Sequence, residues 1–132
     1  MDNKLNGSFI LNENMDLEIN FKDDDAEKSK KESKYTYKIK FDNNEEPIKI
    51  GHTEQSPSNS ATFITKRGYT KPSTTTAELH DEIKRHLESG GSVDIEYTEH
   101  TNTTISTKNI KKKLQDEHKE KYGKYPKFDK QR

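Results

Sequence analysis

The sequence contains no cysteine, and apolar residues make up only 25% of its 132 positions. The absence of cysteine excludes a disulfide framework and a zinc site built on thiolates, and it is compatible with a reducing cytoplasm. No apolar run is long enough to form a membrane span or a signal peptide. We therefore expect a soluble, cytoplasmic protein that has a thin hydrophobic core and no membrane partner.

The sequence also lacks a net charge, because 24 Lys and Arg residues balance 24 Asp and Glu residues. The two signs are nevertheless segregated. Residues 1–32 hold five basic and nine acidic side chains, whereas residues 107–132 hold ten basic and four acidic ones. A segment with such a basic excess is typical of surfaces that bind polyanions. The length predicts one domain.

The first 34 residues divide into two parts. Apolar residues at positions 9–11, and at alternate positions from Met15 to Phe21, predict a hairpin within residues 1–22 that can add to the edge of a sheet. Residues 23–34 are a charge run, which predicts a flexible, solvated linker. The alternative is cation binding by residues 23–25, although three adjacent carboxylates lack the alternating ligand spacing of a calcium loop.

Residues 35–53 combine strand periodicity, a turn and reactive side chains. Apolar and polar residues alternate from Tyr35 to Phe41, which is typical of a half-buried strand. Residues 42–47 have turn composition, and residues 48–50 read as the returning strand, which ends at Gly51. The predicted hairpin carries Tyr37 on one arm.

Residues 54–76 are rich in Ser, Thr, Pro, Asn and Gly and form a long connection. Loops of this length are usually functional or disordered. A short strand at residues 61–67 would place Lys66 and Arg67 near its end. These two side chains either contact phosphate groups or are simply solvated.

Two helices are predicted in the second half of the chain. The first starts at a capping-box pattern, Thr75 with Glu78, and ends at residues 90–91. Its apolar residues Leu79, Ile83 and Leu87 recur at four-residue spacing and form one apolar stripe, and a strand over residues 93–97 follows the helix. The second runs from Ser106 to Tyr122.

The apolar positions of the second helix are Ile110 and Leu114, and the same face continues to Glu117. A carboxylate on a buried stripe is costly without a partner, which would be a metal ion, a cation or a hydrogen-bond donor. In a helix so rich in lysine, an ion pair with a lysine is an equally good interpretation.

The order of elements after residue 34 resembles that of the GIY-YIG nucleases. Their hallmark is two tripeptides on adjacent strands. Residues 35–37, Tyr-Thr-Tyr, stand in the first position, and residues 49–51, Lys-Ile-Gly, stand in the second, with eleven residues between Tyr37 and Lys49. The first tripeptide lacks the family's glycine and isoleucine. Lysine replaces the second tyrosine, and His52 follows three residues later, as in restriction-enzyme-like members. The resemblance covers roughly residues 35–129.

This resemblance implies an α+β fold, with a small three-stranded mixed or antiparallel sheet flanked by two helices. It also implies metal-dependent hydrolysis of DNA phosphodiester bonds. Tyr37 would be the general base or its relay, Lys49 and His52 would position or activate the nucleophile, and Glu117 would bind Mg²⁺ or Mn²⁺. The family's catalytic arginine, expected early in the first helix or just before it, has no exact counterpart: Arg67 comes before the helix and Arg85 late in it, and Arg67 is the candidate. We expect Tyr37, Lys49, His52 and Glu117 to meet at one concave face of the sheet.

A different class of function remains open, namely a non-catalytic phage or mobile-element module. Such a protein would hold nucleic acid with its basic end, or would use its acidic half to mimic nucleic acid and inhibit an enzyme. The sequence leaves homo-oligomerisation open. Residues 124–132 form a basic tail, and the side chains expected to contact phosphate groups are Lys66, Lys111, Lys112, Lys119 and Lys124.

Overall fold

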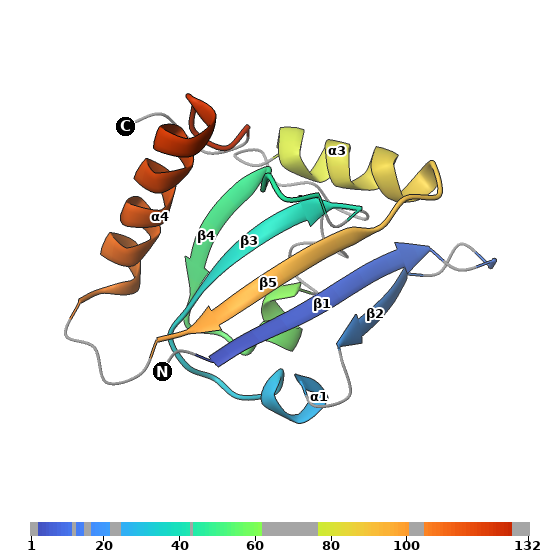
Figure 1. Ribbon diagram of the computed structural model, residues 1–132. Helices are drawn as coiled ribbons and strands as arrows, with labels where there is room; N and C mark the ends of the chain where they lie inside the picture. Colours follow the sequence, from blue (N-terminus) through green and yellow to red (C-terminus); the bar gives the residue numbers. More distant parts are fainter. Residues whose placement is uncertain are drawn as a thin grey trace.

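The computed structural model describes residues 3–11, 13–14, 17–21, 25–42, 44–61, 77–100 and 105–127. These residues form the strands β1 (Asn3–Leu11), β2 (Leu17–Phe21), β3 (Tyr35–Phe41), β4 (Lys49–Thr53) and β5 (Val93–Glu99). They also form the helices α1 (Asp25–Lys28), α3 (Ala77–Glu88) and α4 (Thr107–Tyr122), which Figure 1 shows around the sheet. Residues 57–61 add one further helical turn.

The strands make a single antiparallel sheet in the order β2-β1-β5-β3-β4. The predicted α+β class is confirmed, but the predicted number of three strands is wrong. The N-terminal hairpin joins the sheet because residues 3–9 of β1 pair with residues 93–99 of β5. This pairing joins two segments that are far apart in the sequence, so local hydrophobic periodicity does not predict it.

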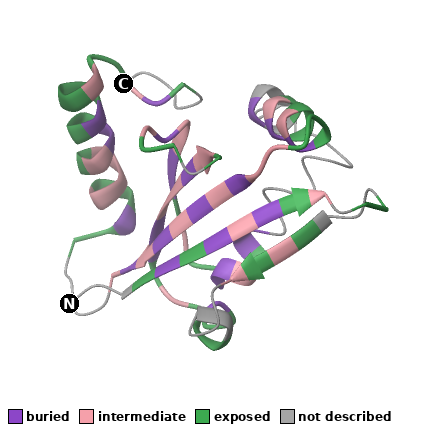
Figure 2. Ribbon diagram, turned by 45° about the vertical axis from the view of Figure 1, so that its right-hand side comes forward, coloured by how far each residue is buried: buried purple, intermediate pink, exposed green. Residues whose placement is uncertain are grey.

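The two faces of the sheet differ in polarity, because successive side chains of a strand point to opposite sides. On one face, Tyr35, Ile39 and Tyr97 are buried in the main hydrophobic core. Helix α3 packs on this face against β1 and β5, and it contributes Leu79, Ile83 and Leu87 to the core, as its four-residue spacing predicts. Figure 2 shows the resulting alternation of buried and partly exposed residues along β5.

Helix α4 packs against β4 and β3 on the opposite, polar face of the sheet (Figure 1). Its predicted ends are confirmed. The Ser106 side chain caps the first turn by accepting a hydrogen bond from the Asn109 N–H at 3.2 Å, and Gly123 ends the helix in the left-handed region at φ 78°. None of the helices in the described residues is long and apolar enough to cross a membrane.

The buried face of α4 differs from the predicted one. Ile110 and Leu114 are only half-buried, whereas Thr107, Gln115 and His118 are buried against the sheet. The helix therefore docks through polar side chains, and its two apolar residues lie at the side of the contact.

Two predictions concern segments outside the core. Residues 25–28, in the segment predicted to be a flexible linker, form the short helix α1, and the Ser29 carbonyl after it accepts a hydrogen bond from the Ser58 N–H at 2.8 Å. Lys66 and Arg67 lie outside the described residues.

Candidate functional site

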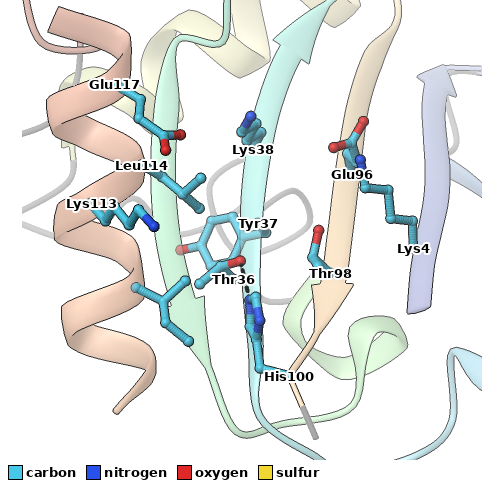
Figure 3. Close-up of a pocket in the computed structure, with 11 residues that line it drawn as sticks. Lys4, Thr36, Tyr37, Lys38, Glu96, Thr98, His100, Lys113, Leu114 and Glu117 are labelled. Carbon is cyan, nitrogen blue, oxygen red and sulfur yellow. Dashed lines mark hydrogen bonds between the residues drawn. The ribbon is translucent and has the colours of Figure 1, made fainter. Parts of the chain in front are cut away.

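A groove lies along one side of α4, over the polar face of the sheet, and Figure 3 shows the side chains that line it. Its floor consists of outward-facing residues of β1, β3 and β5, and one wall is α4. The main hollow has a volume of about 260 Å³. The floor contributes Lys4, Thr36, Lys38, Glu96, Thr98 and His100, and the wall contributes Ile110, Lys113, Leu114 and Glu117.

The floor of the groove carries more positive than negative charge. Lys38 and Glu96 are directly opposite each other in the β3–β5 register, and the Lys40 Nζ lies 3.8 Å from a carboxylate oxygen of Glu96. Within the described part of the chain, neither Lys4 nor Lys38 forms an ion pair with a carboxylate. The floor of this hollow thus holds two lysines, Lys4 and Lys38, and one carboxylate, Glu96, which is paired with Lys40, so the floor remains attractive to an anion.

A hydrogen-bonded pair closes the other end of the floor. The hydroxyl oxygen of Thr36 lies 2.7 Å from the Nε2 of His100 (Figure 3). Thr36 is only 2% exposed, so its hydroxyl is fixed by packing and it holds the His100 ring in place. The pair adds hydrogen-bonding groups to a lysine-rich surface.

The wall side chains Lys113, Leu114 and Glu117 project from α4 toward β3 (Figure 3). Glu117 is exposed, and it forms no ion pair with any cationic side chain that the structure describes. It therefore does not extend a buried stripe, and it needs no compensating partner for desolvation. Its carboxylate is available for a ligand in the groove.

Tyr37 belongs to the lining of the groove, but its ring turns to the other side of β3. The ring packs against Tyr97, with centroids 5.8 Å apart, and contributes to the edge of the main core. It also lies over the Cα of Gly51, the residue opposite Tyr37 on β4. The phenol group is thus in the apolar layer, and the sheet separates it from Glu117.

The remaining two motif residues lie on different faces. Lys49 is paired with Ile39, which is a core residue, so its register position is on the side of the Tyr37 ring. His52 is paired with Thr36, on the groove side. The four residues expected to meet therefore divide into two pairs, Tyr37 with Lys49 and His52 with Glu117.

His52 contacts the first turn of α4. Its Nδ1 lies 3.4 Å from the Thr107 hydroxyl oxygen. Partial burial, followed by the nearby charges of Lys111 and Lys108, lowers the pKa of His52 below its ordinary value, while Glu54 opposes the shift. An anion bound beside His52 would relieve the repulsion among these three groups.

The lysines of α4 and the segment after it fall into two sets. In the C-terminal set, Lys121 lies 2.6 Å from Glu45, Lys124 lies 4.0 Å from Glu46, and Lys127 lies 3.7 Å from Glu82. Lys119 stands over the ring of Tyr125, 5.0 Å from its centroid. The acidic turn between β3 and β4 therefore neutralises much of this set.

The N-terminal set of α4 lysines comprises Lys108, Lys112 and Lys113. None of the three makes an ion pair within the part of the chain that the structure describes. No acidic residue occupies the first turn of α4, so the positive end of the helix dipole adds to their charge. Lys111, beside them, is half-buried near His52.

The residues that sequence reasoning missed are those of the groove floor, above all Lys4, Lys38, Glu96 and His100. Lys4, Lys38 and Glu96 sit at polar positions of alternating strands, which is ordinary for a solvated sheet face, and His100 directly follows the end of β5. Only the register of β1, β5 and β3 brings them together. Among the described residues, no group of three or more His, Cys, Asp or Glu side chains is placed to hold a metal ion.

We compared the chain with family models, with curated protein sequences and with solved structures, and none of the three comparisons gave a match.

Proposed function

We propose that this protein is a cytoplasmic DNA-binding protein that contacts phosphate groups with the first half of α4 and with the adjoining groove. The observation that carries the proposal is the division of the α4 lysines. Among the residues that the structure describes, no carboxylate forms an ion pair with Lys108, Lys112 or Lys113. In contrast, Lys121, Lys124 and Lys127 each form an ion pair with a glutamate.

Unpaired lysines on a helix surface favour binding to a polyanion because each phosphate contact releases condensed counterions. The groove floor adds Lys4 and Lys38 on the same side of the sheet. Contacts of this kind supply affinity and carry no sequence information. We therefore expect binding that is weakly dependent on sequence and strongly dependent on salt.

Binding of a short fluorescent duplex, followed by anisotropy, tests the proposal. The triple variant Lys108→Gln, Lys112→Gln and Lys113→Gln should weaken binding by on the order of tenfold or more at moderate salt. The matched control replaces Lys121, Lys124 and Lys127, which removes the same charge from the paired set. Equal losses in the two variants, or no DNA binding by the wild-type protein, would overturn the proposal.

A metal-dependent endonuclease is the second candidate function, favoured by the carboxylate of Glu117 on a cationic groove. Mg²⁺ keeps several waters and is often bound by only one or two carboxylates plus substrate phosphates, so Glu117 is a suitable ligand for Mg²⁺ or Mn²⁺. The metal would supply charge neutralisation and water activation. This candidate ranks second because the Tyr37 ring and Lys49 lie on the far side of the sheet. Nicking of plasmid DNA with added Mg²⁺ or Mn²⁺ tests it.

A further inference from the structure

The groove continues beyond its main hollow. A second hollow of about 300 Å³ adjoins the first, and the two share Lys38, Glu96, Leu114 and Glu117 in their linings. Each volume is near the lower bound of about 300 Å³ for small-molecule sites. The groove is therefore a channel of two subsites, bounded by a helix on one side and a sheet beneath.

The channel offers different groups to the different parts of a nucleotide. Lys38 and Lys113 offer cations to a phosphate group, from the floor and from the wall. Ile110 and Leu114 are half-buried and present apolar surface, which suits the face of a base. Bases in a duplex are already stacked and paired, so duplex DNA would leave this apolar wall without a contact.

Glu117 is the feature that phosphate binding alone does not explain. Glu117 lines both subsites, and its carboxylate repels a phosphate group. A carboxylate does, however, accept hydrogen bonds from the exocyclic amino group of a base, as with N4 of cytosine. Thymine has no amino group, and its only ring N–H donor lies between two carbonyl oxygens that repel a carboxylate, so a carboxylate in the channel favours cytosine over thymine.

We propose that the channel binds single-stranded nucleic acid in preference to duplex, with phosphates at Lys38 and Lys113 and an amino-bearing base between Leu114 and Glu117. This inference rests on the proposed nucleic-acid binding but goes beyond it, because the lysines of α4 would attract duplex and single strands alike.

The test compares the affinities of the full chain for labelled oligo-dC, oligo-dT, oligo-rC and a duplex of equal length, at one salt concentration. Oligo-dC should bind about tenfold tighter than the duplex, which corresponds to about 1.4 kcal/mol. It should bind about fivefold tighter than oligo-dT, in line with the loss of one base contact. Similar affinities for dC and rC support recognition of bases and phosphates, and a preference for rC assigns the site to RNA.

Two variants sharpen the test. Glu117→Ala should remove the preference for oligo-dC over oligo-dT. Leu114→Ala should weaken the binding of single strands without changing the affinity for duplex. Glu120→Ala is the matched control, because Glu120 is an exposed carboxylate on the same helix but does not line the channel. Duplex binding as tight as that of dC, or equal effects of Glu117→Ala and Glu120→Ala, overturns the inference. If the Lys108, Lys112 and Lys113 variant still loses duplex affinity in that case, the proposed DNA binding stands and only the channel is wrong.

Discussion

The ring of Tyr37 lies directly over the Cα of Gly51, in the space that a Cβ atom would take. The two residues are opposite each other on β3 and β4, and both belong to the tripeptides that resemble nuclease motifs. Glycine at position 51 is thus explained by packing, since the backbone must leave room for an aromatic ring.

Gly51→Ala should destabilise the fold by about 1–3 kcal/mol, because the added methyl group overpacks the site against a ring that also contacts Tyr97. Urea denaturation measures the change. In a Tyr37→Ala background the same substitution should cost almost nothing. Equal costs in both backgrounds would show that the ring is not the obstacle.

Ile83→Ala should destabilise the protein by about 2–5 kcal/mol, since Ile83 is fully buried where α3 meets the sheet. Lys84→Ala is the neighbouring control at an exposed position and should change stability by no more than about 0.5 kcal/mol. Thermal or urea unfolding of both variants makes the comparison. A mild effect of Ile83→Ala would mean that α3 is not docked as described.

His52 should titrate below its ordinary pKa of 6.5, because burial and the charges of Lys111 and Lys108 disfavour its protonated form. A folded-state pKa below the unfolded one means that the unfolded chain binds more protons between the two values. The contribution of His52 to stability is therefore complete above pH 6.5 and is lost as the pH falls through this window. NMR titration of the ring protons measures the pKa.

Two perturbations should move the pKa of His52 upward. Lys111→Gln removes one repelling charge, and DNA bound at the first half of α4 supplies an opposing one. DNA binding should consequently become tighter as the pH falls through the titration of His52. A pKa that neither perturbation changes would place the phosphate contacts elsewhere.

Glu117→Gln should leave the thermal stability of the metal-free protein within about 0.5 kcal/mol of wild type, because Glu117 is exposed and makes no ion pair with described residues. Under the endonuclease candidate, the same variant loses metal-dependent nicking of plasmid DNA. A variant that melts much lower and retains nicking would mean that Glu117 is structural. Purified Glu120→Gln provides the control for loss of one charge from α4.

Local signals in the sequence were sufficient to predict most of the helices and strands. The four-residue spacing of Leu79, Ile83 and Leu87 correctly predicts α3, and Ser106 and Gly123 mark the two ends of α4. These features depend on neighbours along the chain, so one sequence is enough to predict them.

The pairing of β1 with β5 and the docking of α4 could not be predicted in the same way. The pairing depends on register between distant segments, which makes the sheet five-stranded and forms the groove floor. The α4 contact uses Thr107, Gln115 and His118, and hydrophobic periodicity points instead to Ile110 and Leu114. Polar contacts of a docked helix have no periodic signature, and for that reason the candidate site differs from the expected one.

The salt dependence of DNA binding tests the central claim most directly. For wild-type protein the logarithm of the affinity should fall with the logarithm of salt concentration with a slope of about three to five, at roughly 0.9 per phosphate contact. The variant lacking Lys108, Lys112 and Lys113 should reduce this slope by about two to three, and the variant lacking Lys121, Lys124 and Lys127 by less than about one. Equal reductions in the two variants, or a wild-type affinity that salt does not change, would contradict the assignment of the phosphate contacts to the first half of α4.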